Sequence, residues 1–189
     1  MGKFPFYKQH DNMDCGPASL RMIAKFYGKN YQQQSLHERC NITKQGVSLL
    51  AISDAAEFMG FRTKGVKITW EQLVNEVNLP CIVHWRQNHF VVVYKIKQKG
   101  RYKHDNLVCV SDPACGLIEY RESEFKKMWL SDVEEGFNTG IALLLEPTPQ
   151  FYQDNEDSTF NENNGKLKFR FLLGYLYPYK KYFFQILLA

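Results

Sequence analysis

Apolar residues near the amino end recur at the three- and four-residue spacing of an amphipathic helix. Over residues 15–27, Leu20, Ile23 and Tyr27 fall on one face, and Gly28 is placed to end the helix. Similar spacing predicts three more helices, over residues 32–40, 49–59 and 69–77. A strand is predicted over residues 61–68, where apolar and polar residues alternate.

After Pro80 the chain changes to short runs of β-branched and aromatic residues separated by Gly, Asn, Asp and Lys. These runs predict strands over residues 81–85, 89–96, 107–111, 116–121 and 139–145, and a helix over residues 122–129. Helices first and strands later indicate an α+β fold, with a helical N-terminal half and an antiparallel β-sheet in the C-terminal half.

The pattern divides the chain into three parts. Residues 1–146 form the predicted domain, and residues 147–165 are polar and aperiodic, which is typical of a flexible linker. Residues 166–189 combine basic, aromatic and aliphatic side chains, as an interfacial amphipathic segment does. The apolar run after Lys181 has eight residues, whereas a spanning helix needs about 20. We therefore expect the start of a truncated transmembrane domain, the alternative being a tail that folds onto the domain.

Composition narrows the class of protein. The chain has 189 residues, of which 44% are hydrophobic, enough for one packed domain and an extra segment. The net charge of +4 does not by itself indicate nucleic acid binding. Five cysteines without a pairing pattern, and no apolar signal segment after Met1, favour reduced thiols in the cytosol. The chain has no GxxxxGK[ST] motif, so ATP binding by this chain is not expected.

The candidate chemistry begins at Cys15, which is followed by Gly16, Pro17 and a helical pattern. This order places the thiol at a helix N-terminus, where the helix dipole and free N–H groups favour the thiolate. Gln9, six positions earlier, can offer an amide N–H to a developing oxyanion. The plainer interpretation of Cys15 alone is a buried, inert cysteine.

Two later residues complete the set that a thiol protease needs. His89 opens the most apolar predicted strand, and Asp112 ends a later one. Such a carboxylate would fix the tautomer of the imidazole. His84 is the serious competitor because it also lies in a strand-like run, and Asp112 alone is equally consistent with a turn. The remaining histidines are His10, His37 and His104.

Zinc binding is the rival interpretation for His104, Cys109 and Cys115. Their spacing matches neither a CxxC nor an HExxH pattern, so no metal site is predicted. Cys115 is expected to be a turn cysteine close to the site.

At these residues the chain resembles the peptidase family C39 domain of bacterial peptidase-containing ABC transporters, over about residues 3–147. The matching blocks are Gln9 with Asp14-Cys15-Gly16-Pro17-Ala18, the helix after Gly46-Val47-Ser48, Leu79–Trp85, Asn88–Val92 and Asp112–Gly116. The resemblance implies a papain-like cysteine protease fold. It also implies that Cys15 is the nucleophile, His89 the general base and acid, Asp112 the orienting group and Gln9 the oxyanion donor.

The resemblance further implies a cysteine endopeptidase that removes double-glycine-type leaders from precursor peptides before ATP-driven export. Implied partners are the precursor peptide, the transmembrane and nucleotide-binding domains of a transporter that is homodimeric when full length, and the bacterial inner membrane at its cytoplasmic face. No nucleic acid is implied. No cofactor is expected in this chain, since ATP and Mg would belong to a nucleotide-binding domain downstream. The alternatives are a catalytically silent cargo-docking domain, which the intact Cys15 disfavours, and a stand-alone papain-like thiol enzyme, which the membrane-like tail disfavours.

Overall fold

The helices and strands of the chain follow its apolar pattern closely. The computed structural model describes residues 3–11, 13–40, 46–98, 105–134 and 136–153. Its helices are α1 (Cys15–Phe26), α2 (Gln33–Arg39), α3 (Leu49–Phe58), α4 (Trp70–Asn75), α5 (Glu122–Trp129) and the short 3-10 helix η1 (Pro149–Tyr152). Its strands are β1 (Phe61–Ile68), β2 (Cys81–Trp85), β3 (His89–Lys97), β4 (Leu107–Asp112), β5 (Gly116–Arg121), β6 (Asp132–Glu134) and β7 (Phe137–Pro147).

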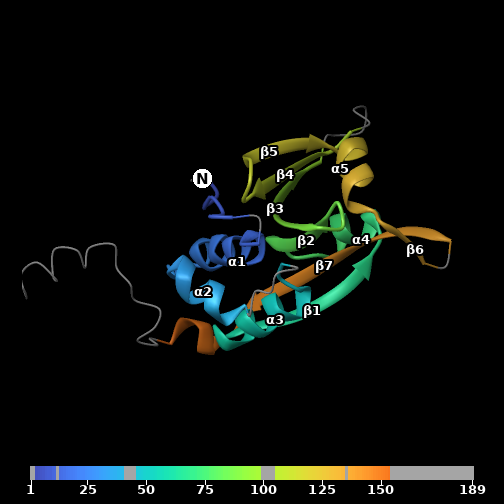
Figure 1. The fold of residues 1–189 in the computed structure, drawn as a ribbon. Coiled ribbons are helices and arrows are strands. Elements are labelled where there is room, and N and C mark those ends of the chain that lie inside the picture. The colour runs from blue at the N-terminus through green and yellow to red at the C-terminus, as the bar shows by residue number, and fades with distance from the viewer. Residues whose placement is uncertain (1–2, 12, 41–45, 99–104, 135, 154–189) are drawn as a thin grey trace, which may run out of the picture.

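One antiparallel sheet forms the centre of the domain (Figure 1). Its strands run in the order β1-β7-β2-β3-β4-β5, and β6 pairs with β7 beside them. Strand β1 pairs along its whole length with β7, the last strand, so the early part of the chain also contributes to the sheet. The α+β prediction is confirmed. Strand β6 is missing from the sequence prediction, because its three residues are all exposed and show no alternation.

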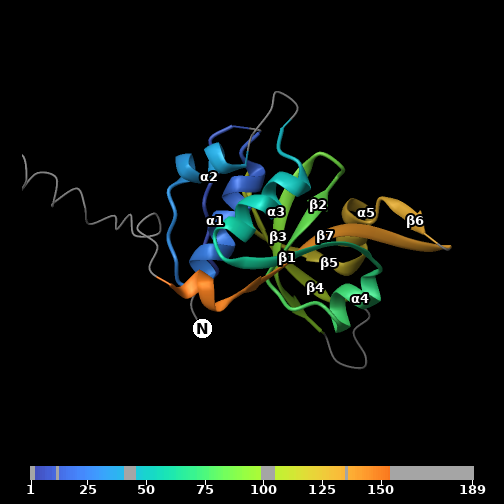
Figure 2. The same ribbon diagram turned by 90° about the horizontal axis from the view of Figure 1, so that it is seen from below.

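Different helices cover the two faces of the sheet, with α1–α3 grouped together and α4 and α5 apart from them (Figure 2). Successive residues of β3 therefore enter different cores. Phe90 and Val92 are buried with α1–α3, whereas Val91 and Val93 are buried with α4 and α5. A strand that is buried on both faces has a continuous apolar sequence, which explains the unbroken apolar run over residues 90–94 of β3.

The packed chain continues past the predicted boundary at Glu146. The Phe151 side chain, on η1, is fully buried, with its ring centroid 4.4 Å from that of Phe61. Gly60 makes room for it, since a Cβ there would lie 2.5 Å from the backbone nitrogen of Phe151. The Thr148 hydroxyl also donates to the Gly60 carbonyl at 2.6 Å. Residues 147–152 of the predicted linker thus pack on the domain, because a distant glycine creates a slot that the local sequence does not reveal.

The rest of the predicted linker and the predicted interfacial segment, residues 154–189, lie outside the described residues. Within the part of the chain that the structure describes, no helix has the length and apolarity to cross a membrane.

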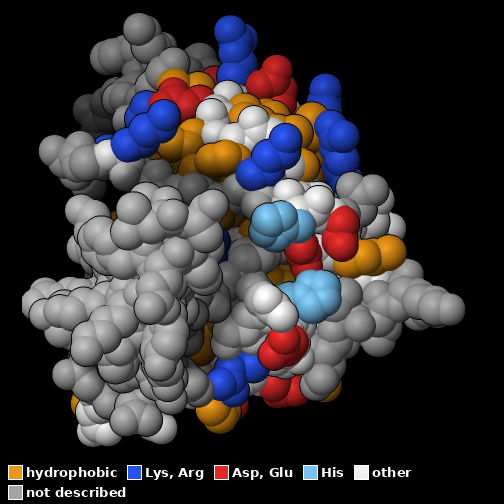
Figure 3. All heavy atoms as spheres, turned by 60° about the vertical axis from the view of Figure 1, so that its left-hand side comes forward, with side chains coloured by type: hydrophobic (Ala, Val, Ile, Leu, Met, Phe, Trp, Pro, Cys, Tyr) orange, Lys and Arg blue, Asp and Glu red, His pale blue; other side chains and the backbone are white. Residues whose placement is uncertain are grey.

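The described part of the face drawn in Figure 3 has mixed charge. Lysine and arginine side chains lie near carboxylates, and apolar side chains are exposed among them.

Candidate active site

Cys15 is the first residue of α1 and is buried, with 4% of its surface exposed. The helix end is packed so closely on α3 that a Cβ on Gly16 would lie 2.7 Å from Cδ1 of Ile52. Asp14 occupies the N-cap position but makes no side-chain cap. Its carboxylate is instead 2.5 Å from Nδ1 of His37 on α2. The free N–H groups of the first turn are therefore left to the site around Cys15.

Helix α1 is fixed across the strands that carry the other candidate residues. The buried Ser19 hydroxyl donates to the Phe90 carbonyl of β3 at 3.2 Å. The Ser111 hydroxyl of β4 lies 2.9 Å from the Met22 sulfur of α1. These contacts join the helix that begins at the thiol to the two strands whose ends form the rest of the site.

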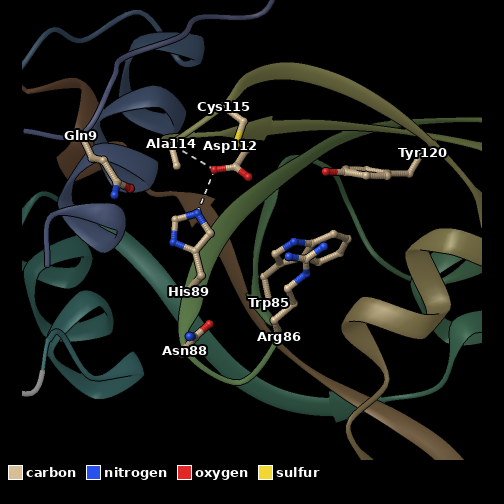
Figure 4. Close-up of a pocket in the computed structure, with 9 residues that line it drawn as sticks. All are labelled: Gln9, Trp85, Arg86, Asn88, His89, Asp112, Ala114, Cys115 and Tyr120. Atoms are coloured by element: carbon tan, nitrogen blue, oxygen red, sulfur yellow. Dashed lines mark hydrogen bonds and ion pairs between the residues drawn. The ribbon is translucent and has the colours of Figure 1, made fainter. Parts of the chain in front are cut away.

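His89 is the first residue of β3 and Asp112 the last residue of β4, and these strands are antiparallel neighbours. The start of β3 and the end of β4 therefore lie side by side. Nε2 of His89 lies 2.8 Å from Oδ1 of Asp112, and the Ala114 backbone N–H donates to the same oxygen at 2.8 Å (Figure 4). Since Asp112 engages Nε2, Nδ1 is the ring nitrogen left to exchange a proton with a thiol.

The pair is electrostatically coupled to Cys15. Burial is the largest influence on His89 and lowers its pKa, but the neighbouring Asp112 and Cys15 side chains outweigh it and raise the pKa to about 9. Burial likewise raises the pKa of Asp112, but the hydrogen bonds from His89 and Ala114 bring it below its ordinary value. A protonated imidazole beside an ionised carboxylate is the arrangement that stabilises a thiolate and supplies an acid to a leaving group.

Gln9 reaches the site from the N-terminal segment. Its backbone N–H donates to the Pro113 carbonyl at 3.0 Å, which ties it to the turn that follows Asp112. Its side chain lines the same cavity as His89 (Figure 4), and its buried Oε1 accepts no hydrogen bond from the described residues. No hydrogen bond of the described residues therefore holds the Gln9 side chain through its amide oxygen.

The cavity beside these residues has a volume of about 420 Å³. It is lined by Gln9, Trp85, Arg86, Asn88, His89, Asp112, Ala114, Cys115 and Tyr120. Sequence reasoning missed Trp85, Arg86 and Tyr120, which come from β2, its following turn and β5. The available signal was weak: three polar residues, 86–88, separate two apolar strands directly before His89. Cys115 lies in the turn after Asp112 and close to the site, as the sequence predicts.

The other histidines are placed differently. His84 lies in β2 against Phe90, with ring centroids 5.1 Å apart, and burial lowers its pKa. His37 pairs with Asp14, and His104 lies outside the described residues. Among the described residues, no group of three or more His, Cys, Asp or Glu side chains is arranged to hold a metal ion.

Comparison with known proteins places this arrangement in a family. The Peptidase C39 family profile matches residues 3–149. This chain belongs to the Peptidase C39 family. The C39 chain is 30% identical over 154 residues to the probable microcin-H47 secretion/processing ATP-binding protein MchF of Escherichia coli. It is 32% identical over 150 residues to the lactococcin-G-processing and transport ATP-binding protein LagD of Lactococcus lactis subsp. lactis. These matches cover 82% and 76% of this chain but only 20% and 19% of the relatives.

Two solved structures are similar to this C39 chain. A double glycine motif protease from an AMS/PCAT transporter, in complex with the leader peptide, matches with a TM-score of 0.65 and 32% identity over 77% of this chain and 93% of that one. The peptidase domain of Streptococcus ComA, a bifunctional ABC transporter involved in quorum sensing, matches with a TM-score of 0.63 and 30% identity over 77% of this chain and 100% of that one. The family and these neighbours identify the chain as a cysteine peptidase.

Proposed function

We propose that this C39 domain removes the leader of precursor peptides after a double-glycine-type motif, with Cys15, His89, Asp112 and Gln9 as its catalytic residues. The observation that carries the proposal is the meeting of a thiol at a helix start with the charged His89–Asp112 pair beside an open cavity. The neighbouring structure, a double glycine motif protease in complex with the leader peptide, supports the substrate class.

In the proposed reaction, His89 takes the thiol proton of Cys15 through Nδ1. The sulfur then attacks the carbonyl carbon of the last leader residue and forms a C–S bond. The Gln9 amide and the first N–H groups of α1 stabilise the oxyanion. As the C–N bond breaks, His89 returns the proton to the leaving amine. Water then hydrolyses the thioester with His89 as base, and Asp112 holds the ring in place throughout.

A leader helix needs an apolar surface on which to dock. On α3, Leu50 and Phe58 are 70% and 59% exposed, although both are large and apolar. The Arg39 guanidinium lies 3.9 Å from the centre of the Phe58 ring. These residues are candidates for the helix-in-groove contact with the apolar face of a leader.

The longer protein is also part of the proposal, since the chain spans about a fifth of the length of the curated relatives it matches. We infer that the domain precedes the transmembrane and nucleotide-binding domains of a homodimeric exporter. ATP and Mg would bind in the nucleotide-binding domain, and cleavage would occur at the cytoplasmic face of the bacterial membrane. The names of the relatives, which combine secretion, processing and ATP binding, support this arrangement.

The test is cleavage of a purified precursor peptide whose leader ends in Gly-Gly, followed by mass spectrometry of the products. We expect one cut directly after the second glycine, and no cut in the Cys15→Ala variant, whose thermal melting shows that it remains folded. Replacing the second glycine with leucine should block cleavage, because a narrow channel excludes the larger side chain. Cleavage by Cys15→Ala at the wild-type rate would overturn the proposal.

A further inference from the structure

The cavity at the active site is asymmetric with respect to the nucleophile. It includes His89 and Asp112 at one end and continues over Trp85 and Tyr120, whose ring centroids are 5.3 Å apart, but Cys15 does not line it (Figure 4). Its volume of about 420 Å³ lies within the roughly 300–1,000 Å³ of ordinary ligand pockets. The space therefore lies on the histidine side of the thiol and can hold peptide side chains.

The chemistry decides which part of a substrate occupies that side. The acid that protonates the leaving amine must lie within hydrogen-bond reach of it. In this site the acid is His89, so the amine and the residues that follow it must extend along the histidine side. Given the proposed function, the first residues of the released cargo peptide would then lie over the cavity.

Arg86 gives this cavity a fixed positive charge. Its backbone N–H donates to the Met128 carbonyl at 3.0 Å, and its Nη2 lies 3.5 Å from the Met128 sulfur. Arg86 and Gln87 both have positive φ, 48° and 62°, and the Asn88 N–H closes the turn on the Trp85 carbonyl at 3.2 Å. Positive φ at both central positions matches the twist of a hairpin between antiparallel strands, so the turn holds Arg86 in a defined place beside the cavity.

The nearby carboxylates are already engaged. Asp112 accepts from His89 and from the Ala114 N–H, and Glu124 accepts from the Arg121 backbone N–H at 3.2 Å. Among the ion pairs of the described residues, none includes the Arg86 guanidinium, whose side-chain partner is a neutral thioether. A thioether is a weak acceptor, so the guanidinium remains available to a carboxylate.

We propose that Arg86 is a specificity-determining residue that selects an acidic side chain at the first residue of the cargo peptide, with Trp85 and Tyr120 forming the wall of that subsite. The inference rests on the proposed leader peptidase function. The Arg86 side chain is exposed, so the effect is that of a surface ion pair, which is worth about two- to five-fold.

The experiment uses three precursor peptides that are identical except for the residue after Gly-Gly, which is glutamate, glutamine or lysine. We expect kcat/KM to fall in that order for the wild type, with glutamate about two- to five-fold above glutamine. Arg86→Lys should keep the order, Arg86→Gln should abolish it, and Arg86→Glu should reverse it. Arg62→Gln, which removes an exposed arginine on the edge strand β1, is the matched control and should leave all three rates unchanged.

The outcomes separate the two proposals. If the wild type cuts all three peptides after Gly-Gly at equal rates, the leader peptidase function stands and the Arg86 inference is wrong. If it cuts none of them, the proposed function itself fails. If Arg86→Gln slowed the cleavage of all three peptides equally, the inference would also be wrong. Such a result would show that Arg86 supports the turn and does not distinguish the charge of the cargo residue.

Discussion

The Asp112→Asn variant tests whether the His89–Asp112 contact controls the active site. The change keeps the shape of the side chain but removes the negative charge that lies 2.8 Å from Nε2 of His89. A hydrogen bond to a charged group contributes about 1.5–3 kcal/mol. Its loss in the transition state should therefore lower kcat/KM by about 10- to 150-fold.

The same change should move the pH dependence of the reaction. His89 must be protonated to supply the leaving amine, and its pKa is raised to about 9, so the alkaline limb of kcat/KM should fall near pH 9 in the wild type. Without the Asp112 charge, less of the effect of burial is offset, so the pKa of His89 falls, although Cys15 still raises it. A loss of about 1.5–3 kcal/mol corresponds to about one to two pH units, so the limb should move down by that amount.

The free energy of unfolding should also depend on pH through His89. A histidine whose pKa rises on folding stabilises the native state fully below its unfolded pKa of about 6.5, and this stability is lost as the pH rises through about 9. Urea denaturation of the wild type should thus show a falling free energy of unfolding between these values. In Asp112→Asn the fall should be smaller and should end at a lower pH.

The assay is cleavage of a fluorogenic leader peptide between pH 5 and 10. Asp132→Asn is the control, because Asp132 forms an exposed ion pair with Lys67 at 2.7 Å, away from the site. It should leave the alkaline limb in place. A wild-type rate with a limb still near pH 9 in Asp112→Asn would refute the role assigned to Asp112.

Three further predictions concern the other residues. His89→Ala should lower kcat by at least about 10³-fold, and His84→Ala much less, as measured by single-turnover cleavage; equal losses would require a different base. Gln9→Ala should lower kcat by about 10²–10³-fold with little change in KM, and a mainly raised KM would instead mean that Gln9 binds the leader. Phe151→Ala should lower the free energy of unfolding by about 3–5 kcal/mol, because the Phe151 side chain is fully buried. Tyr152 is 57% exposed, so Tyr152→Ala should change this free energy by no more than about 0.5 kcal/mol. Equal urea midpoints for the two variants would mean that η1 is not part of the core.

Local pattern was sufficient to predict most of the elements and the position of the thiol. Helical spacing and an ending glycine delimit α1, so Cys15 could be placed at its start without any tertiary information. The apolar run that begins at His89 indicated a strand, and the structure has β3 there. These features depend on neighbours within a few residues, and such neighbours are visible in a sequence.

The tertiary structure decided which of these residues meet. His84 and His89 both lie in strands, but only the order and register of the sheet bring His89 to the end of β4 and leave His84 against Phe90. Pairing between strand ends depends on contacts far apart in the chain, so the local pattern that favoured His89 could not establish its contact with Asp112.

The cavity and the domain boundary have the same physical origin. Trp85, Arg86 and Tyr120 line one space because β2 and β5 lie in the same sheet, although some 35 residues separate them. Phe151 appears in a polar stretch, and its burial depends on the missing Cβ of Gly60, about 90 residues earlier. Sequence alone determined the local structure and the reactive group, whereas long-range packing determined the partners of that group, the cavity beside it and the burial of Phe151.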